Sequence, residues 1–152
     1  MIRYREAVPA DAPSMSEMLR EIAAAGKRTR PSDEGFVRAH YVAGEGHLRC
    51  TVAVEDGRVL GLQKLSRARA GNEWGAPEGD GIIGTHVRPS AARRGIGRAI
   101  FERTLEAARA AGLARIEAFI GERNAEGLAY YEAMGFRTVR EPEGAVVKAL
   151  DL

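Results

Sequence analysis

Positive charge and glycine gather in one short stretch of the sequence. Arg93, Arg94 and Arg98 surround Gly95 and Gly97 there. The stretch lies between an expected strand and an expected helix. The first N–H groups of that helix therefore lack partners and meet the positive end of its dipole. A phosphate or pyrophosphate is the natural ligand of such a site. A Gly-Lys-Ser or Gly-Lys-Thr phosphate loop and the dinucleotide glycine fingerprint are both absent.

A second segment holds side chains that can bind or protonate a ligand. It contains Asn124, the pair Tyr130 and Tyr131, and the dipeptide Gly135-Phe136, and it follows an expected strand. Taken alone, this pattern is typical of an amphipathic helix with core aromatics and a glycine at its C-terminal end.

The two segments together resemble the signatures of the GNAT family of acetyl-CoA-dependent N-acetyltransferases. The resemblance covers roughly residues 80–140, and the N-terminal half only through the order of its elements. It implies that acetyl-CoA is bound by Val87, Arg88, Pro89, Arg94, Gly95, Ile96, Gly97, Arg98, Ala99, Ile100 and Asn124. One position departs from the family: Ala92 stands three residues before Gly95, where Arg or Gln is usual. Backbone N–H groups carry most of the pyrophosphate binding, so we expect binding to persist.

The resemblance also implies roles in acetyl transfer. Tyr131 occupies the position that protonates the coenzyme A sulfur, and an ordinary phenol is protonated at neutral pH. Tyr130 is the competing candidate, and either ring could instead be a core aromatic. Asn124 would bind the pantetheine arm, cap the helix, or do both. The N–H of Val87 would bind pantetheine or polarise the thioester carbonyl, at a bulge that separates its strand from the next.

The general base has several candidates. His86 lies beside the cofactor segment and has an ordinary pKa near neutrality, although a strand histidine without a catalytic task fits equally well. Glu73 and Asp80 could act through water, or the amine could arrive neutral from solution. His40 and His47 lack metal-ligand partners at a useful spacing and are interpreted as structural or surface residues.

The acceptor should lie between the loop after the first helix and the tryptophan loop. Arg28, Arg30, Phe36 and Trp74 are the candidate contacts, although each arginine could simply be solvated. An arginine there would bind a substrate carboxylate, which predicts an amino acid or a related small amine. The alternatives are a peptide or protein N-terminus, or a noncatalytic acyl-CoA-binding module.

Composition limits the class of protein. A chain of 152 residues fits one domain, 1–152, and its net charge of +2 argues against nucleic acid as a partner. A single cysteine, Cys50, excludes an internal disulfide and a cysteine metal cage, and its apolar run predicts a buried, inert thiol; we expect no metal. No signal-peptide pattern or membrane span is found, so a soluble, cytoplasmic protein is expected.

The elements that must position these residues follow from periodicity. Strands are expected at 2–8, 50–55, 59–66, 80–87, 114–120, 136–140 and 145–150, with helices from about 9–26, 32–41, 95–111 and 124–134. Asp56-Gly57 predicts a hairpin turn, and Ser32 is expected as the N-cap of the second helix. The order predicts a mixed α/β (α+β) fold with at least one parallel β-α-β unit on a mixed sheet. The resemblance implies that this is the GNAT fold, with a central mixed twisted sheet of about 6–7 strands flanked by about 4 helices.

The closing strands suggest an oligomer. Phe136, Val139 and residues 145–150 form an apolar C-terminal segment, and an unprotected edge strand invites pairing with another chain. We therefore expect a homodimer whose second subunit helps to limit the acceptor pocket.

Overall fold

The elements follow the expected order. The computed structural model describes residues 1–152. Its elements are β1 (Arg3–Glu6), α1 (Ala12–Ala24), α2 (Glu34–Val37), β2 (His47–Glu55), β3 (Arg58–Arg67), β4 (Gly81–Val87), α3 (Ile96–Ala110), β5 (Arg115–Gly121), α4 (Ala125–Ala133), β6 (Arg137–Arg140) and β7 (Ala145–Asp151). None of the helices has the length and hydropathy that crossing a membrane requires.

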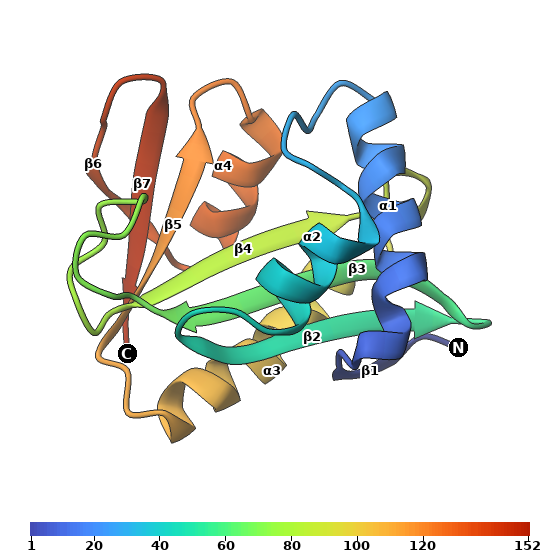
Figure 1. Ribbon diagram of the computed structural model, residues 1–152. Helices are drawn as coiled ribbons and strands as arrows, with labels where there is room; N and C mark the ends of the chain where they lie inside the picture. Colours follow the sequence, from blue (N-terminus) through green and yellow to red (C-terminus); the bar gives the residue numbers. More distant parts are fainter.

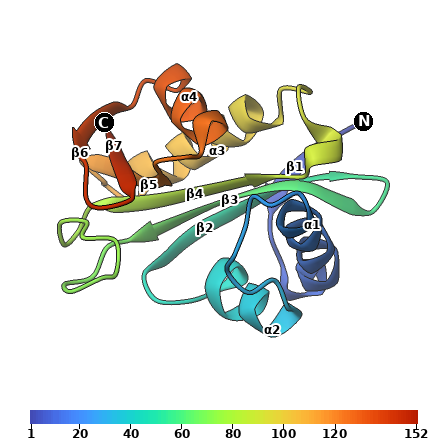
Figure 2. The same ribbon diagram turned by 90° about the horizontal axis from the view of Figure 1, so that it is seen from above.

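One seven-stranded sheet runs through the molecule in the order β1-β2-β3-β4-β5-β7-β6. Every neighbouring pair is antiparallel except β4 and β5, which α3 connects as a parallel pair. Helices α1 and α2 cover one face, and α3 and α4 cover the other (Figure 2). The predicted mixed sheet with about four flanking helices is confirmed.

Apolar periodicity explains both helical layers. In α1, Met15, Met18, Leu19 and Ile22 recur on one face and are buried against β2 and β3. On the opposite side, α3 packs across β2, β3 and β4, and α4 packs on β5. Cys50 lies in the α1 layer, where burial raises the pKa of its thiol to about 12, so the thiol stays protonated at neutral pH.

The second helix differs in detail from the sequence expectation. Asp33, rather than Ser32, is its N-cap, because the Asp33 carboxylate accepts the Phe36 N–H at 3.0 Å. The α-helix ends at Val37 and continues as a π-type segment, Arg38–Val42.

Strands β4 and β5 are paired over only part of their length. Their register joins Gly81 to Ile116 and ends where Ile83 meets Ala118. Beyond that point β4 continues beside β3 while β5 turns away, and the two strands open as a V (Figure 1). The rest of β4 therefore has backbone groups that no strand covers on this side.

The C-terminal edge of the sheet is formed by β6, which contains Val139, and not by residues 145–150. Strand β7 is internal, because it pairs with β5 on one side and β6 on the other, and Phe136 is buried. The edge strand is β6, which is short and bears Arg137 and Arg140. Charge and shortness protect a sheet edge from pairing, so this edge lends no support to a dimer.

The homodimer nevertheless stays a prediction. Light scattering at micromolar concentration is expected to give twice the mass of one chain, since two-fold dimers are common among soluble proteins. A mass equal to one chain would reject it.

Candidate active site

An anion site lies where the loop after β4 enters α3. None of the backbone N–H groups of residues 93–98 donates a hydrogen bond within the protein. Arg93 and Gly95 both have positive φ, 64° and 75°, which turns the chain so that successive N–H groups face outward before the helix begins. Unpaired N–H groups at a helix start, with the dipole behind them, favour a phosphate.

The two glycines of this loop have different functions. Gly95 is needed for its left-handed backbone, and a Cβ added there would meet nothing within 4 Å. At Gly97, an added Cβ would lie 2.6 Å from Cε1 of Tyr130. Gly97 was expected to contact the cofactor, and its missing side chain also makes room for the Tyr130 ring of α4. The hydroxyl of that tyrosine donates to the Gly97 carbonyl at 2.8 Å.

The four arginines of the segment are not equivalent. Arg88 is buried, donates to the Val59 carbonyl at 2.8 Å and pairs with Glu17 and Glu21, so its side chain ties β4 to α1. Arg94 pairs with Glu55 at 2.7 Å. Arg93 and Arg98 make no ion pair or side-chain hydrogen bond and border the same cavity as Gly95. Among the expected cofactor residues, Arg88, Pro89, Ala99 and Ile100 do not line that cavity.

The opening between β4 and β5 exposes backbone groups of β4. Arg88 donates its N–H to the Leu60 carbonyl of β3 at 2.7 Å. Neighbouring residues of an antiparallel strand alternate in direction, so Val87 and Thr85 direct their N–H groups away from β3. These groups point into the space that β5 has left.

Tyr131 reaches the same opening from α4. Its hydroxyl shares a hydrogen bond of 2.7 Å with the Thr85 hydroxyl, and its ring packs edge-on against Phe136, with ring centres 5.1 Å apart. Burial raises the pKa of the Tyr131 phenol above its ordinary value, which keeps it protonated. The Tyr130 hydroxyl forms its hydrogen bonds away from this opening. Besides its bond to Gly97, it accepts a hydrogen bond from Gln63 Nε2 at 2.9 Å.

Asn124 caps α4. Its side-chain oxygen accepts the Gly127 N–H at 3.0 Å, and the residue lines the cavity near Tyr131. The cap uses the oxygen and leaves the amide N–H₂ group without a protein partner.

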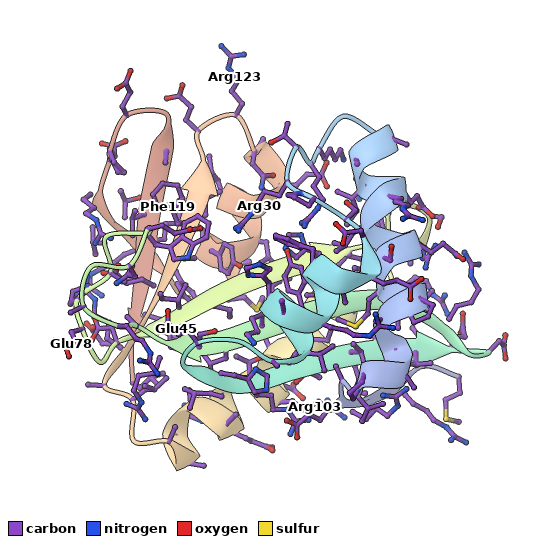
Figure 3. The ribbon with its side chains drawn as sticks, in the orientation of Figure 1. Arg30, Glu45, Glu78, Arg103, Phe119 and Arg123 are labelled. Atoms are coloured by element: carbon purple, nitrogen blue, oxygen red, sulfur yellow. The ribbon has the colours of Figure 1, made fainter.

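The expected acceptor residues come together at the other end of the cavity. Arg30 lies 5.4 Å from the Phe36 ring centre and 5.1 Å from that of Trp74, so it joins the two loops. Figure 3 shows Arg30 beside the gap between β4 and β5, with Phe119 on β5. Arg28 donates to the Tyr41 hydroxyl at 3.0 Å and to the Pro31 carbonyl at 2.6 Å. His40, interpreted as structural, stacks on Phe36 at 4.1 Å.

His86 lies close to the charges of Arg28 and Arg30. The Tyr41 hydroxyl is 3.4 Å from its Nε2 atom. Burial, followed by the charges of Arg28 and Arg30, lowers the pKa of His86 to about 3. The imidazole is therefore neutral at physiological pH, and its low basicity makes it a poor proton acceptor for an amine.

Other candidates for proton transfer differ in position. Glu73 borders the acceptor end and lies 3.6 Å from Arg30. Asp80 is outside the cavity, 3.8 Å from Arg115. No group of three or more His, Cys, Asp or Glu side chains is arranged to hold a metal ion.

Sequence reasoning missed Thr85, Tyr41 and Phe119. Phe119 had a recognisable signal: it alternates with Arg115 and Glu117 on the polar side of β5, where an apolar ring needs a partner. Tyr41 and Thr85 carried no such signal, because their partners are 45 and 46 residues away in the chain.

The comparisons agree with this geometry. Residues 13–136 match the model of the acetyltransferase (GNAT) family, and the chain belongs to that family.

Individual relatives give more detail. A stretch of 53 residues is 43% identical to a mycothiol acetyltransferase of Beutenbergia cavernae, covering 35% of this chain and 18% of the relative's length. The fold resembles a GCN5-related N-acetyltransferase from Kribbella flavida, with a TM-score of 0.78, 24% identity and coverage of 99% and 98% of the two chains. It also resembles a Salmonella typhimurium protein, a proposed acetyltransferase solved with acetyl-CoA, with a TM-score of 0.74, 20% identity and coverage of 99% and 94%.

Proposed function

We propose that the protein transfers an acetyl group from acetyl-CoA to the primary amine of a small carboxylate-bearing molecule, an amino acid or a related metabolite. Transfer is direct, with both substrates bound together. The observation that carries the proposal is that one cavity is continuous from the N–H groups at Gly95, past Tyr131, to Arg28 and Arg30. Such a cavity provides a phosphate site, a proton donor and a carboxylate site in sequence.

Acetyl-CoA occupies the end of the cavity at α3. Its pyrophosphate lies on the N–H groups of residues 93–98, and its pantetheine arm passes Asn124 between β4 and β5. The thioester carbonyl meets the N–H of Val87, which points into the opening. The acetyl-CoA bound to the Salmonella typhimurium protein supports this choice of acyl donor.

Transfer begins when the neutral amine attacks the thioester carbon. The new C–N bond forms, and negative charge on the carbonyl oxygen is stabilised by the backbone N–H. The carbonyl then re-forms as the C–S bond breaks, and the departing sulfur takes the proton of the Tyr131 hydroxyl. The attacking nitrogen releases one proton to water in the cavity, and a proton from water returns to the Tyr131 oxygen, so the amide, the free thiol and the neutral phenol result. The amine arrives neutral from solution, because His86 is too weak a base to deprotonate it.

The loops that border the acceptor end favour a small acceptor over a protein terminus. Arg30 bridges Phe36 and Trp74, so the loop after α1 and the loop before β4 meet at this end of the cavity. Stacking between two rings holds the guanidinium in place for a carboxylate.

A thiol-release assay with acetyl-CoA and a panel of amines tests the proposal. We expect turnover with one or more free amino acids, and slower turnover with the decarboxylated amine of the same side chain. Turnover with peptides and with none of the small amines would contradict it.

Replacing Arg30 with alanine is expected to remove the preference for the carboxylate. The KM of the amino acid should rise about tenfold, the factor that a lost charge-assisted hydrogen bond gives. The KM of the decarboxylated amine should not change. Arg38→Ala is the matched control, because Arg38 pairs with Glu34 on the surface of the neighbouring helix. An equal rise for both amines would argue against carboxylate binding.

Replacing Arg98 is expected to weaken coenzyme A binding more than replacing Arg94. The Arg98 side chain is free to pair with a phosphate, whereas Arg94 is paired with Glu55. Calorimetry at low salt should show affinity about tenfold lower for Arg98→Ala. The loss should diminish as salt screens the charge. Equal losses from the two variants would place the phosphates elsewhere.

A further inference from the structure

We propose that the ion pair between Glu117 and Arg140 positions the acceptor site by clamping the loop that carries Trp74. The inference rests on the proposed function, because it assigns the clamp to acceptor affinity. Arg140 is a positioning residue: it acts through the backbone of the loop and lines no part of the cavity.

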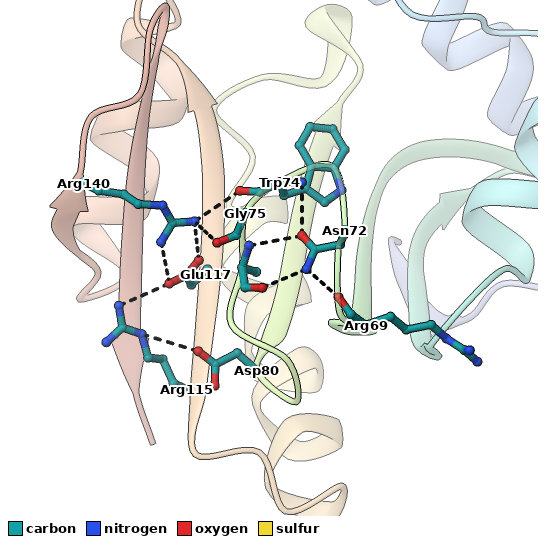
Figure 4. A network of polar contacts seen from close by, with 9 residues as sticks. Arg69, Asn72, Trp74, Gly75, Asp80, Arg115, Glu117 and Arg140 are labelled. Atoms are coloured by element: carbon teal, nitrogen blue, oxygen red, sulfur yellow. Dashed lines mark hydrogen bonds and ion pairs between the residues drawn. The ribbon is translucent and has the colours of Figure 1, made fainter.

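The clamp has two sides. On the sheet side, the Arg140 guanidinium binds both carboxylate oxygens of Glu117, at 2.9 and 3.0 Å. On the loop side, it donates to the carbonyls of Trp74 and Gly75, at 3.2 and 3.0 Å (Figure 4). Glu117 is only 2% exposed, so its charge fixes the guanidinium firmly. The planar guanidinium of an arginine carries five N–H donors, so it can bond to the carboxylate and to the loop carbonyls at the same time.

The loop has no other hydrogen bond to the sheet near Trp74. The Asn72 side chain accepts the N–H groups of Trp74 and Ala76 and donates to two carbonyls of the same loop, so it shapes the loop internally. Ala68 closes the two ends of the loop by bonds to Gly79 and Asp80. For residues 70–78, only Arg140 provides hydrogen bonds to a strand.

The clamp reaches the acceptor site through the Trp74 ring. That ring packs on Phe119 at 5.3 Å and lies against the Arg30 guanidinium. Releasing the backbone at Trp74 therefore frees the surface that holds Arg30 in place. A shift of the order of 1 Å in a positioning group can lower kcat/KM by up to about a hundredfold.

The clamp can be opened without unfolding the sheet. Arg115 remains 3.2 Å from Glu117 after Arg140 is replaced, so the buried carboxylate keeps one cationic partner. Arg140→Gln removes the fork. Arg140→Lys keeps a charge for Glu117, but a lysine ammonium cannot serve two carboxylate oxygens and two carbonyls together. Arg137→Gln is the matched control, because Arg137 is on the same strand and pairs with Asp151 on the surface.

The first measurement is the fluorescence of Trp74, the single tryptophan of the chain. In Arg140→Gln and Arg140→Lys we expect red-shifted emission and stronger quenching by acrylamide, with unchanged circular dichroism. Arg137→Gln should match the original protein. If Arg140→Gln does not fold, the emission and quenching of Arg140→Lys decide whether the clamp exists. Unchanged emission and quenching in a folded variant would overturn the clamp.

The second measurement separates positioning from a merely structural role. With the best amino acid of the panel, the two Arg140 variants should raise the KM of that acceptor about tenfold or more. The KM of acetyl-CoA should be unchanged and kcat should fall much less. An acceptor KM equal to that of the original protein, or an equal rise for acetyl-CoA, would overturn the assignment. If the original protein acetylates no amine, the proposed function fails, and the fluorescence still decides the clamp.

Discussion

Replacing Tyr131 with phenylalanine is expected to lower kcat by about a hundredfold or more, the usual contribution of a positioned general acid. The ring remains packed against Phe136 in the same core cluster, so the fold and the affinity for acetyl-CoA should be retained. The loss reflects the missing O–H, which a raised pKa keeps protonated until the sulfur departs. Steady-state kinetics with the best amine of the panel, together with calorimetry for coenzyme A, measure both quantities.

The neighbouring tyrosine provides the control. Tyr130→Phe removes a hydroxyl that bonds to Gly97 and Gln63 and should reduce stability by about 1 kcal/mol while leaving most of kcat. Equal losses of kcat from the two variants, or none from Tyr131→Phe, would mean that Tyr131 is not the proton donor.

Replacing Gly97 with alanine is expected to have the largest effect on the architecture of the cofactor end. The added methyl would meet Cε1 of Tyr130 at 2.6 Å, so the Tyr130 ring or the two helices must shift. Overpacking of this kind costs about 1–3 kcal/mol. We expect a lower free energy of unfolding in urea. Weaker coenzyme A binding should accompany it, because the N–H groups that receive the phosphates begin the helix that carries the added methyl.

A second substitution tests the cause. In a Tyr130→Leu background the ring is gone, so Gly97→Ala should add less than about 0.5 kcal/mol, the range of ordinary surface substitutions. A double-mutant cycle measures this coupling directly. Gly121→Ala is the control for adding a methyl, since nothing lies within 4 Å of that position and its φ is not positive. Full additivity of Gly97→Ala and Tyr130→Leu would exclude the contact as the cause.

The two tyrosine-centred predictions also separate two functions of α4. Tyr130 bonds to the Gly97 carbonyl of α3, while Tyr131 bonds to Thr85 of β4, beside the position proposed for the reacting sulfur. Adjacent residues of a helix point about 100° apart, so one short helix can contribute to both ends of the transfer site.

The sequence by itself determined the order and type of the elements. Helical spacing at Met15, Met18, Leu19 and Ile22 predicts the buried face of α1, because a buried face of a helix must recur every three to four residues. The anion site could also be predicted from one short stretch of the sequence. A glycine with left-handed backbone followed by the first turn of a helix lies within a few residues, so its N–H groups can be inferred from the chain.

Only the tertiary structure decided which side chains are free to act. Arg88 and Arg94 are taken up by glutamates from α1 and β2, while Arg98 is left open, and nothing in the motif distinguishes them. The pKa of His86 is lowered first by burial and then by Arg28 and Arg30, which are 58 and 56 residues earlier in the sequence. The edge position of β6 and the clamp at Glu117 likewise depend on strand order. These properties are set by charges and contacts between distant segments, and periodicity within a segment contains no information about them.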